Sequence, residues 1–142
     1  MISLTLPYPP SLNHLYATVR GRRVLSEEGR QYKKDVFLDA CQQGAARNML
    51  TGDVWVTLHF YRPRKAGDLD NLLKATLDAL TGICWKDDKQ IVSIEACRFE
   101  DKDKPRVWLW ARTHPAPGIE RPLAPSAHGS DSPVLPQEQA PE

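Results

Sequence analysis

The chain has 142 residues, a formal net charge of +1 and three cysteines, a size that fits one small domain with its own core but not two. The cysteines are odd in number and lack a C-x-x-C spacing, so they indicate neither a disulfide framework nor a zinc site. No apolar run is long enough to span a membrane and no basic-then-apolar segment begins the chain, so we expect a soluble protein of the cytoplasm with no membrane association.

The near-neutral charge hides an asymmetry along the chain. Residues 1–112 hold 18 Lys/Arg against 14 Asp/Glu, a balance of +4, whereas residues 113–142 hold one against four, a balance of −3. Seven of the 12 prolines also lie in that last segment, where large apolar side chains are almost absent. Such a segment cannot bury enough surface to offset its ordering entropy. We therefore expect a basic domain at 1–112, suited to a polyanionic partner, and a Pro-rich, acidic, disordered tail at 113–142.

The first 25 residues predict a strand, a stiff loop and a basic turn. Residues 2–6 alternate apolar and polar side chains, as a half-buried strand does. Three prolines stop this strand, so we expect a surface loop at 7–16. The aromatic and amide side chains of this loop, among them Asn13, are candidates for stacking on unpaired bases or for bonding phosphates. Alternatively, Tyr8 and Tyr16 only close the edge of the core. The turn that follows contains a glycine and three arginines that we interpret as a grip on a backbone phosphate: Arg20, Arg22 and Arg23.

A long helix and a long strand come next. Ser26 is a helix cap before two acidic residues, and the apolar spacing beyond it predicts a helix to about residue 47. Residues 54–61 alternate between an aliphatic face and a face of Trp, Thr, His and Tyr, which predicts a strand covered on both sides. The loop after this strand carries three cations in four residues, which form a candidate phosphate clamp: Arg62, Arg64 and Lys65.

The remaining elements are one helix and two strands. Leucines at three- and four-residue spacings predict a helix at 69–80, which a Thr-Gly pair ends. Residues 90–100 and 106–112 predict strands that a polar turn joins into a closing β-hairpin. Together the elements predict an α+β fold with a small mixed β-sheet and two main helices.

Acidic residues gather where the helix at 69–80 begins. Asp70 is the candidate N-cap, because its carboxylate can accept backbone N–H groups of the first turn. A cap does not require Asp68, and two close carboxylates repel each other unless a cation, a proton or a basic side chain intervenes. A second acidic pair, Asp87-Asp88, follows after one helix and one turn. Carboxylates without Cys or His companions favour Mg²⁺ or Mn²⁺ over zinc.

The polar side of the same helix carries Asn71 and Lys74. Lys74 follows Asp70 by four residues, or roughly one turn, so we expect its ammonium group on the same side as that carboxylate. Both residues are candidates for contacts with DNA.

The chain resembles the RusA family of Holliday-junction resolvases, found in phages and prophages. Three segments carry the resemblance in order and spacing: Asp-Leu-Asp-Asn-Leu-Leu-Lys at 68–74, Asp-Ala-Leu-Thr-Gly at 78–82 and Trp-Lys-Asp-Asp-Lys-Gln-Ile-Val at 85–92. Leu-Pro-Tyr-Pro-Pro-Ser-Leu-Asn at 6–13 resembles the family's opening segment, and the resemblance runs from about residue 2 to about residue 112. It implies a RusA-like α+β homodimer that cuts branched DNA with Mg²⁺, for which Mn²⁺ can substitute, and that needs no nucleotide cofactor. It also implies metal binding by Asp68, Asp70 and Asp88, with Lys74 as the essential basic residue.

The features together predict a Mg²⁺-dependent endonuclease that resolves Holliday junctions by paired nicks, in DNA recombination and repair. Paired cuts need two active sites and a body of 112 residues is too small for both, so we expect a homodimer. Two alternatives stay open: a non-catalytic protein that binds branched DNA, and a nuclease for flaps or other branched DNA. Asp88 distinguishes the first alternative, because a helix-cap account of the acidic residues gives it no role.

Overall fold

A computed structural model describes residues 1–65 and 67–114. Three α-helices and two 3-10 turns are formed: α1 (Leu12–Leu15), α2 (Glu27–Gln42), η1 (Ala45–Asn48), α3 (Leu69–Leu80) and η2 (Asp88–Gln90). The strands are β1 (Ile2–Pro7), β2 (Tyr16–Val19), β3 (Arg22–Leu25), β4 (Val54–Arg62), β5 (Ile91–Glu100) and β6 (Arg106–Thr113). This is the mixed α+β composition that the sequence predicts. None of the helices in these residues is long and apolar enough to cross a membrane.

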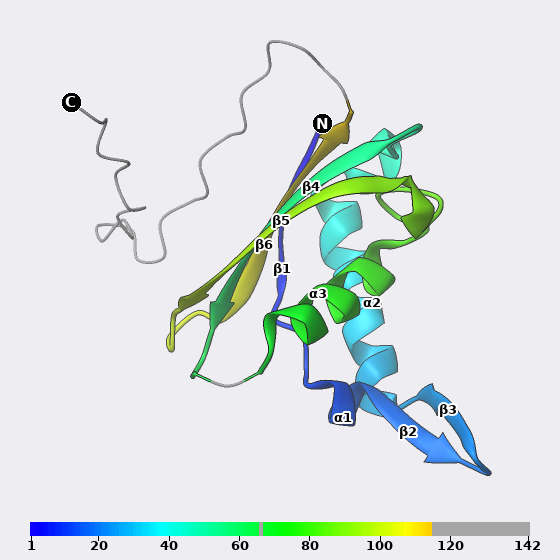
Figure 1. The fold of residues 1–142 in the computed structure, drawn as a ribbon, viewed down its shortest axis with the longest axis vertical. Helices are drawn as coiled ribbons and strands as arrows, with labels where there is room; N and C mark the ends of the chain where they lie inside the picture. The colour runs from blue at the N-terminus through cyan, green and yellow to red at the C-terminus, as the bar shows by residue number, and fades with distance from the viewer. Residues whose placement is uncertain (66, 115–142) are drawn as a thin grey trace.

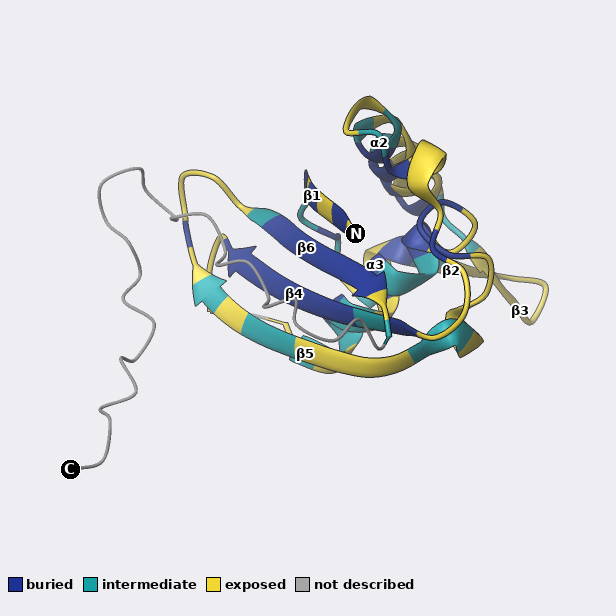
Figure 2. Ribbon diagram, turned by 90° about the horizontal axis from the view of Figure 1, so that it is seen from above, coloured by how far each residue is buried: buried dark blue, intermediate teal, exposed yellow. Residues whose placement is uncertain are grey.

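The main sheet has four strands in the order β1-β6-β4-β5. Strand β6 runs antiparallel to both of its neighbours, and β5 runs parallel to β4. Helices α2 and α3 lie over one face of this sheet (Figures 1 and 2). The main core fills the space between the two layers, with apolar side chains from β1, β4 and β6 meeting those of both helices.

The predicted hairpin of the last two strands is wrong, although both strands form. Strand β4 lies between β5 and β6 and pairs with each of them. Its side chains are buried at all but one position, so it takes the centre of the sheet. Helix α3 supplies the crossover connection that a parallel pair needs. The alternation that marks a strand in the sequence does not say which strand is its neighbour.

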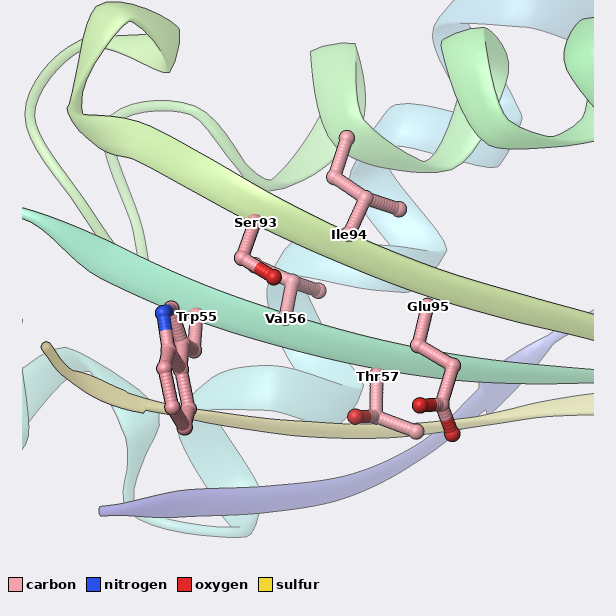
Figure 3. Close-up of a pocket in the computed structure, with 6 residues that line it drawn as sticks. All are labelled: Trp55, Val56, Thr57, Ser93, Ile94 and Glu95. Carbon is pink, nitrogen blue, oxygen red and sulfur yellow. The ribbon is translucent and has the colours of Figure 1, made fainter.

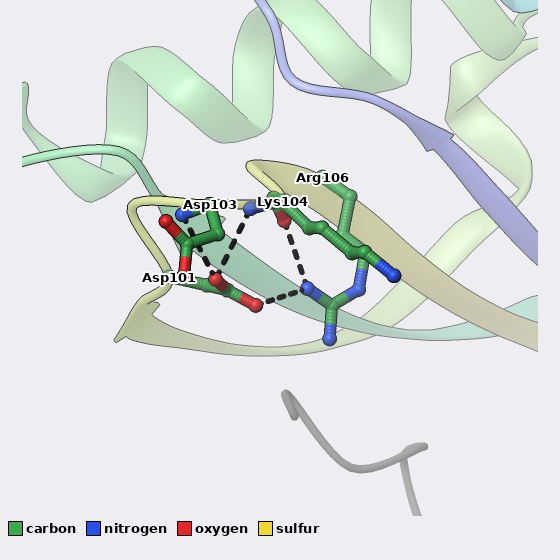
Figure 4. Close-up of polar contacts among 4 residues, drawn as sticks. All are labelled: Asp101, Asp103, Lys104 and Arg106. Atoms are coloured by element: carbon green, nitrogen blue, oxygen red, sulfur yellow. Dashed lines mark hydrogen bonds and ion pairs between the residues drawn. The ribbon is translucent and has the colours of Figure 1, made fainter. Parts of the chain in front are cut away.

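The connection between β5 and β6 is held by one buried carboxylate. Asp101 accepts the backbone N–H groups of Asp103 and Lys104 at 3.2 and 3.1 Å, and an Nη1 donation from Arg106 at 2.7 Å (Figure 4). Arg106 also donates to the Lys104 carbonyl at 2.8 Å. This turn carries the chain past the end of β4, where the Asp101 N–H donates to the Arg62 carbonyl at 2.8 Å.

The face of the sheet opposite the helices holds a second cluster of aromatic residues. Tyr61, Trp108 and Trp110 are buried there, next to Phe99. The Arg106 guanidinium lies 4.0 Å from the centre of the Tyr61 ring. The prediction that both faces of β4 are covered is therefore confirmed.

The N-terminal loop and the long helix differ in detail from the prediction. Four residues of the predicted loop wind into α1, because Leu12 and Leu15 pack against the core. Helix α2 ends at Gln42, five residues before the predicted end. Gly44 adopts a φ of 85°, a left-handed conformation that stops the winding, and η1 follows.

Ser26 is the N-cap of α2, as predicted, and it also ties α1 to α2. Its hydroxyl accepts the Gly29 N–H at 2.9 Å. The Ser26 N–H and hydroxyl both donate to the Leu15 carbonyl, at 2.8 and 3.0 Å. Gly29 is buried, and a Cβ atom there would collide with that same carbonyl oxygen. Helix α2 therefore begins with the backbone of α1 in direct contact.

The predicted tail lies almost wholly beyond the residues described. Strand β6 continues to Thr113, and the His114 N–H donates to the Asp53 carbonyl at 2.7 Å. Residues 115–142, on which the prediction of a disordered acidic segment falls, lie outside the described part of the chain.

Candidate active site

The two carboxylates that follow β4 lie at the start of α3. Asp68 occupies the N-cap position with extended backbone angles (φ −83°, ψ 144°), and Asp70 lies in the first turn. The prediction that Asp70 caps the helix is therefore wrong. Winding begins at Leu69, whose side chain packs against the core, and this sets the cap one residue earlier. The Asp68 side chain makes no capping hydrogen bond, so both exposed carboxylates remain available for a cation.

Lys74 lies one turn further along α3. Its ammonium nitrogen is 3.7 Å from an Asp78 carboxylate oxygen, and its side chain is well exposed. Exposed ion pairs of this spacing contribute little to stability. A phosphate could therefore replace Asp78 as the partner of Lys74 at little cost. Asn71 is half-buried on the same helix.

Asp88 lies in η2, where its neighbour Asp87 serves as the local cap. The Asp87 carboxylate accepts the Lys89 N–H at 2.9 Å, and this hydrogen bond lowers the pKa of Asp87. The Gln90 side chain accepts the N–H groups of Lys86 and Asp87 at 2.8 and 3.0 Å. Asp87 and Asp88 are both exposed, and Asp87 is the one that serves as the cap.

The structure holds η2 at the far end of α3 from Asp68. Gln90 donates to the carbonyls of Leu50 and Gly52 at 3.1 and 2.9 Å, which fixes η2 beside the residues that precede β4. Asp68 instead follows the end of β4. Helix α3 has 12 residues and so spans roughly 18 Å between these two places. Among the residues described, no group of three or more His, Cys, Asp or Glu side chains could hold a metal ion within one chain.

The loop between β4 and α3 is rich in positive charge, as the sequence predicts. Arg64 and Lys65 are exposed. Arg62 is buried, with an Nη2 atom 3.6 Å from Glu100 and an Nη1 atom 3.4 Å from the Gly67 carbonyl oxygen. The predicted clamp therefore has two exposed cations and one inward-facing cation.

Arg98 also reaches this loop, and the sequence does not reveal it as a site residue. Its Nη1 atom lies 3.4 Å from the same Gly67 carbonyl oxygen. The parallel register places Arg98 opposite Phe60, two residues before Arg62 on β4. The predicted hairpin pairs β5 with the wrong strand, so it gives no reason to bring Arg98 to this loop.

The other predicted DNA-binding residues lie elsewhere. Strands β2 and β3 form a two-stranded arm that projects away from the main sheet, beside the start of α2 (Figure 1). Its turn is formed by Arg20 and Gly21, both with positive φ. Arg22 and Arg23 begin β3, and the Arg23 guanidinium lies 4.3 Å from the centre of the Tyr16 ring. Asn13 is exposed in α1, at the base of this basic arm.

Hollows of different sizes lie on the described part of the chain. One of about 320 Å³ lies over β4 and β5 and is lined by Trp55, Val56, Thr57, Ser93, Ile94 and Glu95 (Figure 3). It contains none of the predicted site residues. A second hollow, of about 160 Å³, reaches the loop before Asp68 and is lined by Tyr8, Pro9, Ser11, Pro63, Arg64, Gly67 and Leu72.

Comparison with known proteins shows the family to which the chain belongs. The sequence model of the family described as Endodeoxyribonuclease RusA matches residues 7–109. Crossover junction endodeoxyribonuclease RusA of Shigella sonnei (strain Ss046) is 40% identical over 99 residues, which cover 68% of this chain and 82% of the relative. The proteins of that name from Escherichia coli (strain K12) and Enterobacteria phage 82 are also 40% identical over 99 residues, which cover 82% and 81% of those chains. The chain belongs to the RusA family of endodeoxyribonucleases.

Proposed function

We propose that the chain is a Mg²⁺-dependent endonuclease that resolves Holliday junctions by paired nicks. The observation that carries this proposal is the pair of exposed carboxylates, Asp68 and Asp70, directly after a loop with several cations. The relatives named above are crossover junction endodeoxyribonucleases, which supports a four-way junction as the substrate.

The donor set suits Mg²⁺, because carboxylate oxygens are the hard ligands that this ion prefers. Asp68, Asp70 and Asp88 would hold it, and Mn²⁺ can take its place. When bound, the ion supplies hydroxide near neutral pH and neutralises charge on the phosphate. Lys74 stabilises the negative charge that develops on the scissile phosphate, from a position one turn along the same helix.

A second copy of the chain completes this donor set. Within one chain, Asp88 and Asp68 lie at opposite ends of α3, so the third carboxylate must come from another chain. A two-fold dimer makes two equal sites of this kind, each with Asp68 and Asp70 from one chain and Asp88 from the other. Two sites related by symmetry are what paired nicks on opposing strands require.

The open edge of β5 is the surface that we assign to this dimer. Strand β5 is at the edge of the main sheet, and it begins just after Asp88 and ends near Gly67. Val92 and Ile94 on this strand are about half exposed. If two β5 strands pair antiparallel, the start of one lies beside the end of the other. That pairing brings each Asp88 toward the partner's Asp68.

The remaining candidates bind the DNA backbone. Arg64, Lys65 and Asn71 lie next to the carboxylates and contact phosphates close to the cut. The basic arm holds a more distant part of the junction through Arg20, Arg22 and Arg23, with Asn13 at its base. Selection of the junction then depends on the shape of the DNA and the spacing of its phosphates.

The test is cleavage of labelled four-way, flap and linear duplex DNA by the full-length chain, with Mg²⁺, with Mn²⁺ and with chelator. We expect symmetric nicks in the four-way junction only when a metal ion is present. Tight binding of the junction without nicking in any metal would show a non-catalytic protein. A preference for flaps would show a nuclease with a different substrate.

A further inference from the structure

Two guanidinium groups converge on one neutral oxygen atom just before Asp68. Arg62 comes from the end of β4 and Arg98 from β5, and each places an Nη1 atom 3.4 Å from the Gly67 carbonyl oxygen. At 3.4 Å these hydrogen bonds are at the long end of the usual range, so they hold the two cations weakly. Like charges that share one weak acceptor repel each other, and an anion between them would remove that repulsion.

Nearby acidic groups compensate only part of this charge. Arg62 pairs with Glu100 at 3.6 Å, and the Glu100 side chain is itself about half exposed. The Nε atom of Arg62 is buried without a hydrogen-bond partner in the part of the chain that the structure describes. Arg98 is exposed and donates to the Gly67 carbonyl. Arg62, Arg98 and Glu100 together carry a net charge of +1, before the Asp68 and Asp70 carboxylates, which the metal ion would neutralise, are counted.

Tyr8 adds a neutral donor to the same place. Burial raises the pKa of Tyr8, and the nearby charges of Arg62 and Arg98 oppose this effect without cancelling it. The hydroxyl therefore keeps its proton at neutral pH and can donate it to an anion. Tyr8 also lines the hollow of about 160 Å³ that Arg64 and Gly67 border. Tyr8 and Gly67 thus border one hollow, Arg62 and Arg98 reach the Gly67 carbonyl, and Asp68 is the next residue along the chain.

We propose that Arg98, Arg62 and Tyr8 form a binding site for one phosphodiester group of the DNA strand, next to the Asp68 and Asp70 carboxylates. Arg62 and Arg98 supply the charge, and the Tyr8 hydroxyl supplies a further hydrogen bond. The bound phosphate takes the place of the Gly67 carbonyl as the partner of Arg98. The site fixes the strand relative to the carboxylates, so this inference rests on the proposed function.

The test is the salt dependence of binding to a four-way junction, measured with Ca²⁺ in place of Mg²⁺. The slope of log K against log salt concentration is negative, and each phosphate contact that is lost reduces its magnitude by about 0.9. Because the proposed dimer loses one such contact in each chain, we expect Arg98→Ala to reduce the magnitude of the slope by about 1.8 and to weaken binding about a hundredfold. Arg98→Lys should keep the slope and weaken binding less. Tyr8→Phe should weaken binding about threefold with no change in slope, because the hydroxyl carries no charge.

Arg47→Ala is the matched control, because Arg47 is an exposed arginine in η1, beyond the C-terminal end of α2. It should keep the slope and affinity of the unchanged protein. Equal slopes for Arg98→Ala and the unchanged protein would overturn the proposal. So would an equal loss of affinity for the junction in Arg98→Ala and Arg47→Ala. If the unchanged protein cuts junctions while Arg98→Ala binds them normally, this phosphate site fails and the proposed function stands. If the unchanged protein neither binds nor cuts junctions, both fail.

Discussion

At its first turn α3 presents Asp68 and Asp70 to solvent, whereas the chain beyond its last turn is fixed in place. There Trp85 is fully buried, and the Gln90 side chain makes four hydrogen bonds to the backbone. No capping bond holds the Asp68 side chain at the other end. Asp88 therefore cannot move to Asp68 without breaking the anchored end. This contrast between the two ends of α3 supports our proposal that Asp88 serves a site on another chain.

Mixing two inactive variants is the strongest test of whether a site takes its carboxylates from two chains. Asp70→Asn and Asp88→Asn should each reduce cleavage on the order of 10³-fold or more, because each removes a charged metal ligand. In a mixed dimer, one of the two shared sites keeps every carboxylate. Cleavage should therefore recover on mixing and subunit exchange, to about one quarter of the original nicking when half the dimers are mixed. If the mixture stays inactive, Asp88 does not complete the site of another chain, and the proposed sharing is wrong.

A charge on the β5 edge should separate the two chains. Ile94→Lys places an ammonium group in the proposed interface, so we expect a monomer by light scattering and loss of cleavage by about 10²-fold or more. Leu38→Lys on α2 is the control, because Leu38 and Ile94 are exposed to nearly the same extent, 47% and 46%. It should leave a dimer that cuts normally. A monomer from Leu38→Lys and a dimer from Ile94→Lys would move the interface to α2.

Removing the anchor of η2 should cost stability. Gln90→Ala leaves two carbonyl and two N–H groups without their side-chain partner. We expect a loss of about 2–4 kcal/mol in the free energy of unfolding, measured with urea. Gln42→Ala changes the same side chain at an exposed position at the end of α2 and should stay within about 0.5 kcal/mol of the original. An equally small effect of Gln90→Ala would mean that η2 is not rigidly held.

Alanine substitutions at two glycines of similar geometry, one before and one after α3, allow a direct comparison of the two ends of this helix. Gly67 and Gly82 have φ values of 89° and 90°, and a Cβ atom would meet no neighbour at either. Alanine at each position should cost about 1–2 kcal/mol through backbone strain alone. Only Gly67→Ala should also weaken junction binding, because the Gly67 carbonyl lies between Arg62 and Arg98. Equal binding by both variants would show that the loop before Asp68 tolerates a change of shape.

The sequence predicts most elements of this fold, because the spacing of apolar residues sets which segments wind and which extend. The apolar stripe of α3 and the Ser26 cap are confirmed. The neighbour of β5 could not be predicted, since alternation along a strand is the same for either partner. For that reason Arg98 was missed. Helix α1 was missed because four residues between prolines and a strand carry too little periodicity.

The positions of the site residues follow from chain order only in part. Asp68 and Asp70 are separated by a single residue, so their place at the start of α3 could be predicted almost to the residue. The place of Asp88 depends on the length of α3 and on hydrogen bonds between Gln90 and the residues before β4, which are far apart in sequence. The resemblance to RusA names Asp88 as a ligand, but it does not say from which chain that ligand comes.

The contact between Gly29 and Leu15 has a consequence for the basic arm. Helix α1 leads into the arm and α2 leaves it, and the two helices touch where a single hydrogen atom takes the place of a side chain. A methyl group at residue 29 would push α1 and α2 apart. The basic arm would then change its direction relative to the main sheet, and the arginines at its tip would move with it. The direction of the basic arm therefore depends on the absence of a side chain at Gly29.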